Sequence, residues 1–149
     1  LIVLALNKES DLQGGLKEIS KEIEVVFANT QNVLAACDLA IVASGTATLE
    51  AAILSKPMVV IYKSNFFSNF ILSNFFLKTK FISLPNILSQ EKIVFELRQN
   101  QVTGREIYKK TIITLRNKKD ISDKLNSLRK SLLVQDPSKF SRAIQEILS

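Results

Sequence analysis

The residues best suited to bind a ligand lie between a short apolar run, residues 39–42, and a run that reads as a helix. They are Ser44, Gly45 and Thr46. At a helix start the backbone N–H groups are unpaired and lie at the positive end of the dipole, so they attract phosphate. Glycine lets a ligand approach the backbone closely. The pattern predicts a site for a nucleotide diphosphate, with Glu50 accepting hydrogen bonds from the sugar hydroxyls.

A second interpretation of the same turn needs no ligand. Small residues with hydroxyl side chains are also what the start of any helix requires, and most such turns bind nothing. The local pattern alone therefore leaves both interpretations open, and the surrounding chain has to decide between them.

Composition limits the class of protein. The chain has 149 residues, of which 46% are hydrophobic, enough for one domain with a substantial core. Its net charge of +6 favours an anionic partner, either nucleic acid, an acidic membrane or a phosphorylated small molecule. The basic residues are mostly lysines and are spread along the chain without a nucleic-acid-binding motif, which disfavours nucleic acid.

Cysteine and histidine content excludes several kinds of chemistry. One Cys and no His rule out a Cys/His metal site and a His-dependent nucleophile within this chain. We therefore expect no metal and no cofactor. Residues 1–6 lack the features of a signal peptide and read as a strand entered in mid-domain, so we expect a C-terminal piece of a longer protein.

Strands alternate with helices along the first two thirds of the chain. The expected strands are residues 1–6, 24–27, 39–42, 58–62 and 81–84. The expected helices are residues 11–22, 31–37 (with Thr30 as N-cap), 47–54, 90–99, 105–116, 121–133 (with Asp120 as N-cap) and 138–148 (after Asp136 and Pro137). This order predicts an α/β fold, a Rossmann-like parallel sheet with helices on both faces and a helical C-terminal tail.

We expect a single domain, residues 1–149, with an α/β core to about residue 105 and terminal helices from about 106 to 149. Such sheets bind ligands beyond the carboxyl ends of their strands, where Ser44–Thr46 lie.

One segment combines aromatic residues with an absence of acid. Residues 51–90 contain no Asp or Glu, and residues 65–78 are apolar around most of a helical circumference. The aromatic side chains are Phe66, Phe67, Phe70, Phe75 and Phe76. A helix of this kind is either buried in a core, the commoner case, or lies on an anionic membrane, and both remain open.

Three segments resemble the lipid-A-disaccharide synthase family of GT-B glycosyltransferases. They are Ser-Gly-Thr-Ala-Thr-Leu-Glu-Ala-Ala at 44–52, Lys-Pro-Met-Val-Val-Ile-Tyr-Lys at 56–63 and Phe-Ile-Ser-Leu-Pro-Asn-Ile-Leu at 81–88. Glu96 and Gln99 fit the family's next pattern. The resemblance implies the C-terminal, nucleotide-sugar half of a GT-B fold, which consists of two Rossmann-like domains with the active site between them.

The resemblance also implies a reaction and its site. The family transfers 2,3-diacylglucosamine from UDP-2,3-diacylglucosamine to 2,3-diacylglucosamine 1-phosphate without a metal, giving lipid A disaccharide 1-phosphate and UDP. It would act in the cytoplasm, on the inner face of the bacterial inner membrane. Ser44, Gly45 and Thr46 would hold the diphosphate and Glu50 the ribose. Asn86 either faces the interdomain cleft and binds the nucleotide sugar or is simply a turn residue.

The chain also departs from the family pattern. Lys63 replaces the Arg that usually follows the Tyr at position 62, which keeps the charge but loses the planar fork. A Gly-Ser-Arg turn and the general base are expected upstream of Leu1, so we expect the chain alone to be inactive, with its catalytic residues unknown. The alternatives are another UDP-N-acetylglucosamine enzyme of the same architecture, an epimerase included, and a non-catalytic membrane-surface module.

Overall fold

The computed structural model describes residues 3–6, 24–27, 30–63 and 80–134. The chain divides into two compact units, Leu1–Cys37 and Asp38–Ser149, which are described separately. Three expected segments fall outside the described residues: the helix at 11–22, the aromatic run at 65–78 and the helix at 138–148 with its Asp136-Pro137 start.

The first unit contains two parallel strands and one helix. Strands β1 (Val3–Leu6) and β2 (Glu24–Phe27) pair in register, with Val3 opposite Glu24 and Leu6 opposite Phe27. Helix α2 (Thr30–Ala36) follows β2 and contacts β1. All three elements match the expected ones to within about two residues, which is ordinary variation at element ends.

The second unit is built on a three-stranded parallel sheet. Its strands are β3 (Ala40–Ala43), β4 (Met58–Tyr62) and β5 (Phe95–Arg98), in the order β3-β4-β5. The central strand β4 supplies the core, because Met58, Val59 and Val60 are fully buried. Strand β3 lies at the edge of this sheet, and Ile41 in it remains 49% exposed.

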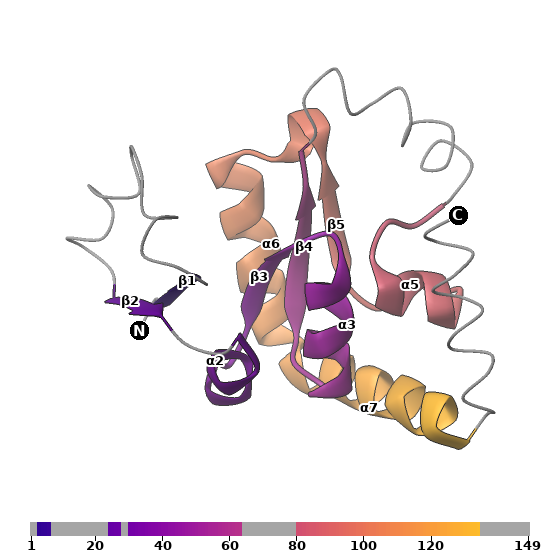
Figure 1. Ribbon diagram of the computed structural model, residues 1–149. Helices are drawn as coiled ribbons and strands as arrows, with labels where there is room; N and C mark the ends of the chain where they lie inside the picture. Colours follow the sequence, from indigo (N-terminus) through magenta and orange to yellow (C-terminus); the bar gives the residue numbers. More distant parts are fainter. Residues whose placement is uncertain (1–2, 7–23, 28–29, 64–79, 135–149) are drawn as a thin grey trace. The chain divides into compact units, whose positions relative to one another are not determined.

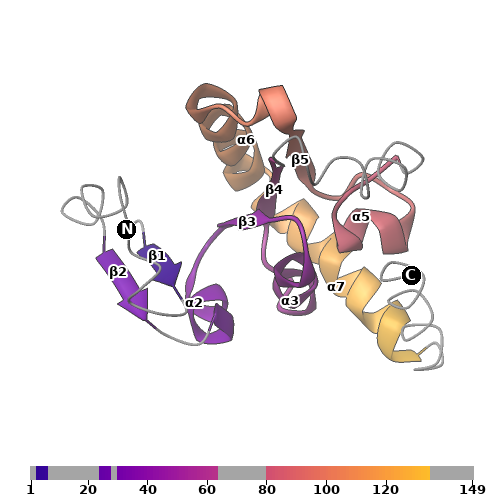
Figure 2. The ribbon, with the colours of Figure 1, turned by 45° about the horizontal axis from the view of Figure 1, so that its top comes forward.

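Helices cover both faces of this sheet. They are α3 (Thr46–Ile53), α5 (Leu84–Ser89), α6 (Gly104–Arg116) and α7 (Lys118–Val134), with the short 3-10 helix η2 (Gln99–Gln101) after β5. Helix α6 packs on β4 and β5, and α3 lies on the opposite face, where it contacts α5 and α7 (Figures 1 and 2). The apolar face of α7 closes this side with the buried residues Ile121, Leu125 and Leu128. The expected Rossmann-like α/β class, with helices on both faces and in the tail, is confirmed.

Two elements differ from the sequence-based expectation. Residues 81–83, expected as a strand, are irregular and lead into α5, because Ser83 is an extended N-cap and Pro85 follows in the first turn, where proline favours a helix. The helix expected at residues 90–99 does not form: residues 90–94 are irregular, and residues 95–98 form β5 beside β4. Buried Leu97 on this strand secures the pairing, which overrides the helical propensity of the segment.

The start of α7 also differs. Asp120 was expected as its N-cap, but the helix begins at Lys118 and Asp120 lies in the first turn. There its carboxylate pairs with Lys124 at 2.8 Å, one turn further along. Acidic residues stabilise the first turn of a helix through the dipole, so Asp120 still favours this helix start. Within the described ranges, no helix combines the length and the apolar character that crossing a membrane requires.

Candidate functional site

The turn after β3 has a backbone conformation that favours glycine. Ser44 N–H donates to Ile61 O at 2.9 Å, which extends the pairing of β3 with β4 by one residue. Gly45 then adopts φ 147° and ψ −160°, a region that is nearly restricted to glycine. Among the described residues, a Cβ at this position would meet no atom within 4 Å. Gly45 is therefore required by its backbone angles, and the described part of the chain leaves the space beside it open.

The start of α3 is not capped by a side chain. Gly45 occupies the N-cap position, and among the described residues no acceptor is found for the N–H groups of Thr46 and Ala47. These two groups lie at the positive end of the helix dipole. Beside the open space at Gly45, they are donors available to an anion.

The three hydroxyl groups of the turn have different roles. Ser44 Oγ donates to Ile82 O at 2.8 Å, so its proton is engaged within the protein. Thr48 is fully buried; its Oγ1 donates to Gly45 O at 2.7 Å and accepts from Leu84 N–H at 3.3 Å. Thr46 is exposed, and within the described part of the chain its hydroxyl has no hydrogen-bond partner. Of the three, Thr46 is the hydroxyl that is free to donate to a ligand.

Further polar groups stand at the same edge of the sheet. In the parallel register Ala43 lies opposite Ile61, so β3 and β4 end together and the exposed Lys63 follows directly. Glu50 is partly exposed on α3, one turn after Thr46, and its carboxylate has no partner among the described residues. Parallel sheets bind ligands at this edge, which agrees with the expected placement of Ser44–Thr46.

Asn86 does not face solvent. Its side chain is fully buried: Oδ1 accepts from Ile93 N–H at 2.8 Å and Val94 N–H at 3.0 Å, while Nδ2 donates to Val94 O and Glu96 Oε1, each at 2.9 Å. An amide side chain has two donors and two acceptor sites, and all four are used here. Of the two roles left open by the sequence, the geometry supports the structural one, with Asn86 in the first turn of α5 instead of in a surface turn. Its side chain fixes the chain between α5 and β5.

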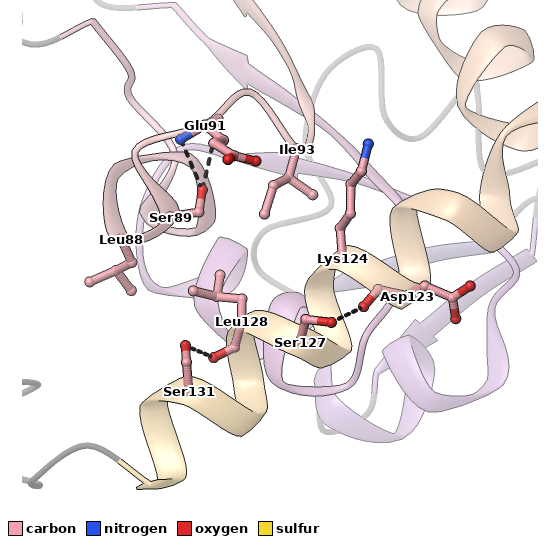
Figure 3. Close-up of a pocket in the computed structure, with 9 residues that line it drawn as sticks. All are labelled: Leu88, Ser89, Glu91, Ile93, Asp123, Lys124, Ser127, Leu128 and Ser131. Carbon is pink, nitrogen blue, oxygen red and sulfur yellow. Dashed lines mark hydrogen bonds between the residues drawn. The ribbon is translucent and has the colours of Figure 1, made fainter.

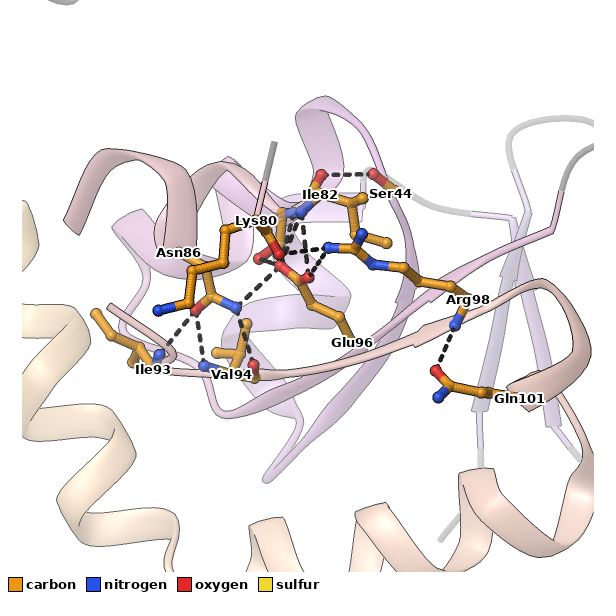
Figure 4. Close-up of polar contacts among 10 residues, drawn as sticks. Ser44, Lys80, Ile82, Asn86, Ile93, Val94, Glu96, Arg98 and Gln101 are labelled. Atoms are coloured by element: carbon orange, nitrogen blue, oxygen red, sulfur yellow. Dashed lines mark hydrogen bonds and ion pairs between the residues drawn. The ribbon is translucent and has the colours of Figure 1, made fainter. Parts of the chain in front are cut away.

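Glu96 is the centre of the most extensive polar cluster in the described residues (Figure 4). Its carboxylate accepts from Ser83 Oγ at 2.7 Å, Ser83 N–H at 2.9 Å, Ile82 N–H at 3.1 Å, Asn86 Nδ2 at 2.9 Å and Arg98 Nη2 at 3.0 Å. Burial alone would raise the pKa of Glu96. The hydrogen bonds from Ser83, Arg98 and Ile82 outweigh this effect and hold the pKa below its ordinary value, so the group is ionised at neutral pH.

The signal for this cluster was present in the sequence but ambiguous. Glu96 and Arg98 alternate with the apolar residues Phe95 and Leu97, which is the two-residue period of a strand. Over four residues this alternation does not distinguish a strand from the end of a helix. The sequence indicates Glu96 only through its fit to the family pattern, and its buried contacts with Ser83 join residues more than ten positions apart, which no local pattern shows.

A separate open groove of about 520 Å³ lies between α7 and the end of α5 with its connection to β5 (Figure 3). It is lined by Leu88, Ser89, Glu91, Ile93, Asp123, Lys124, Ser127, Leu128 and Ser131. None of these residues belongs to the Ser44–Glu50 stretch. Among the described residues there is also no group of three or more His, Cys, Asp or Glu side chains that could hold a metal ion.

A parallel sheet flanked by helices, with a glycine turn and an uncapped helix start at its carboxyl edge, defines a Rossmann-like fold. The family model described as lipid-A-disaccharide synthetase matches residues 1–147. The chain therefore belongs to the lipid-A-disaccharide synthase family, glycosyltransferases of lipid A biosynthesis, and the resemblance inferred from its motifs is confirmed.

Individual relatives support the same assignment. The chain is 35% identical over 129 residues to the lipid-A-disaccharide synthase of Colwellia psychrerythraea, covering 86% of this chain and 33% of the relative. It is 49% identical over 81 residues to the enzyme of Cellvibrio japonicus, covering 54% and 21%. For a Vibrio cholerae enzyme the identity is 37% over 103 residues, covering 68% and 27%. The chain thus spans about a third or less of the length of these relatives.

Proposed function

We propose that the chain is the nucleotide-sugar-binding part of a lipid-A-disaccharide synthase. The complete protein would transfer 2,3-diacylglucosamine from UDP-2,3-diacylglucosamine to 2,3-diacylglucosamine 1-phosphate, forming lipid A disaccharide 1-phosphate and UDP. The observation that carries the proposal is the uncapped start of α3 at Gly45, within a chain whose family is established. We assign no catalytic residue to this chain.

In this proposal the diphosphate of the donor lies beside Gly45, where the space is open. The N–H groups of Thr46 and Ala47 and the Thr46 hydroxyl would donate to its oxygens, and Ser44 would set the shape of the turn through Ile82 O. When the glycosidic bond to UDP breaks, negative charge builds up on the leaving diphosphate. Donors held in place before the reaction stabilise such charge without further reorganisation.

The rest of the donor would extend along α3. Glu50 is one turn from Thr46 and partly exposed, which suits a carboxylate that accepts hydrogen bonds from the ribose. Because donor and acceptor both carry acyl chains, we place the complete protein at the inner face of the bacterial inner membrane. The phenylalanines at 66, 67, 70, 75 and 76 remain the proposed lipid contacts.

The experiment is a calorimetric titration of the chain with UDP. In Thr46→Val one exposed donor is lost at nearly constant volume, so UDP affinity should fall about three- to tenfold while unfolding is unchanged. Glu50→Ala should lower the affinity for UDP more than for inorganic pyrophosphate, which lacks the ribose. Glu91→Ala, an exposed carboxylate in the separate groove, is the matched control. If UDP affinity survives both Thr46→Val and Glu50→Ala, the nucleotide does not bind at this turn.

A further inference from the structure

Two residues on β5 hold the segment that leads into α5. Glu96 and Arg98 are two positions apart on a strand, so both side chains leave the same face of the sheet. Arg98 Nη2 donates to Lys80 O at 2.8 Å, and Glu96 accepts the N–H groups of Ile82 and Ser83. Together with the bond from Ser83 Oγ, these contacts fix residues 80–83, which belong to no helix or strand.

The same segment holds the phosphate-binding turn in place. Ile82 N–H donates to the Glu96 carboxylate, and Ile82 O accepts the hydrogen bond from Ser44 Oγ (Figure 4). Two residues later, Leu84 N–H donates to Thr48 Oγ1, which in turn donates to Gly45 O. One peptide segment therefore connects the Glu96 carboxylate to both engaged hydroxyls of the turn.

We infer that Glu96, with Arg98 as its counter-ion, is a positioning residue for the phosphate-binding turn at Ser44–Thr46. This inference rests on the proposed function, because it assigns Glu96 to the site at which UDP would bind. Neither Glu96 nor Arg98 lies in the turn; they act through Ile82. Fixing the Ile82 carbonyl fixes the Ser44 side chain, and with it the path of the backbone from Ser44 into Gly45 and Thr46.

The burial of the Glu96 carboxylate, paired with a partly exposed Arg98, supports a role in geometry over one in stability alone. The Glu96 side chain is 6% exposed, and removing a carboxylate from water is costly even when it is paired. Apolar side chains in such a place often give equal or greater stability. A carboxylate with five donors around it instead defines one arrangement of those donors, as fully satisfied buried networks do.

The first test is free of ligand. Backbone amide spectra are compared for the wild-type chain, Glu96→Gln and Glu91→Gln, which removes an exposed carboxylate of the same size. In Glu96→Gln the NH₂ group of the glutamine faces some of the same donors that now bind the carboxylate, so their hydrogen bonds are lost. Glu96→Gln should therefore shift the amide signals of Gly45 and Thr46. Glu91→Gln should leave these signals unchanged. Unshifted Gly45 and Thr46 signals in a folded Glu96→Gln chain would overturn the inference.

The second test measures UDP affinity in Glu96→Gln, Ser44→Ala and the double variant. Each single change should weaken UDP binding about tenfold, and the double variant little more, since both act through Ile82. Independent effects, about a hundredfold together, would show that Glu96 does not act through the Ile82 contact of Ser44, and that result would overturn the inference. If the Glu96→Gln variant does not fold, the Ser83→Ala variant takes its place in both tests. Ser83→Ala removes one donor to the Glu96 carboxylate and should weaken UDP binding by a smaller factor, about threefold.

These tests separate the inference from the proposed function. A wild-type chain that does not bind UDP contradicts the proposed function, whereas the amide signals of Gly45 and Thr46 still decide whether Glu96 positions the turn. If the wild-type chain binds UDP and Glu96→Gln binds it with the same affinity, the proposed function stands. The role of Glu96 in positioning the turn is then contradicted.

Discussion

The replacement of Asn86 by Asp changes one NH₂ group to an oxygen and alters almost nothing in volume. At neutral pH the new carboxylate can no longer donate to Val94 O or to Glu96, which Asn86 contacts at 2.9 Å each. It also places a second negative charge beside Glu96 at a fully buried position. Breaking buried hydrogen bonds to leave an unpaired charge costs about 3–5 kcal/mol, a large part of the roughly 5–15 kcal/mol by which domains are stable.

The loss of stability should depend on pH in a defined direction. Burial and the neighbouring Glu96 disfavour the charged form of an Asp at position 86, so its pKa in the folded state should rise above the unfolded value of about 3.9. A raised folded pKa means that the folded chain binds the proton more tightly, so the destabilisation shrinks as pH falls toward the unfolded pKa. The protonated carboxyl then regains one donor for Glu96.

The assay is urea unfolding at about pH 7 and about pH 5, from which the free energy of unfolding is extrapolated. Asn100→Asp makes the same chemical change at an exposed position and should alter stability by less than about 0.5 kcal/mol. A loss below about 1 kcal/mol for Asn86→Asp, or one that does not shrink at the lower pH, would refute the four-bond arrangement around Asn86.

Two further outcomes are expected. Gly45→Ala should lower the free energy of unfolding by about 1–3 kcal/mol. Alanine at φ 147° is strained, although its Cβ would meet no atom of the described residues. A thermal melt with no change would show that the turn does not hold this conformation. The pKa of Glu96 in the folded chain lies below its ordinary value of 4.5. The contribution of Glu96 to stability is therefore complete above pH 4.5 and is lost as the pH falls through the folded pKa. The free energy of unfolding, measured at a series of acidic pH values, should show this loss in the wild type and not in Glu96→Gln.

The sheet and the turn could be predicted because local sequence determines them. Residues 58–62 are an unbroken apolar run, and the small residues after β3 leave few conformations besides a turn. The irregular conformation of residues 81–83 and the strand at residues 95–98 could not be predicted in this way. The N–H groups of Ile82 and Ser83 are bound by Glu96, more than ten residues away, and no local pattern contains that contact.

The individual roles within the site also depend on contacts distant in sequence. Ser44 and Thr46 look equivalent in the sequence, but the carbonyl of Ile82, 38 residues further on, engages one hydroxyl and leaves the other exposed. Asn86 follows a proline in what reads as a surface turn, and only the folding of residues 93 and 94 around it makes it a buried residue. Sequence identifies the groups available for binding, and tertiary contacts decide which of them are free.

The position of β3 leads to an expectation for the unit Asp38–Ser149 produced by itself. In the unit Asp38–Ser149, β3 pairs with β4 alone among the described residues, and its four residues include no charge and no proline. Charges and prolines are the features by which sheet edges resist joining to a second chain. With Ile41 half exposed beside this edge, concentrated samples of the unit should tend to self-associate edge to edge. A lysine at position 41 would make the unit easier to keep monomeric without touching the turn at Gly45.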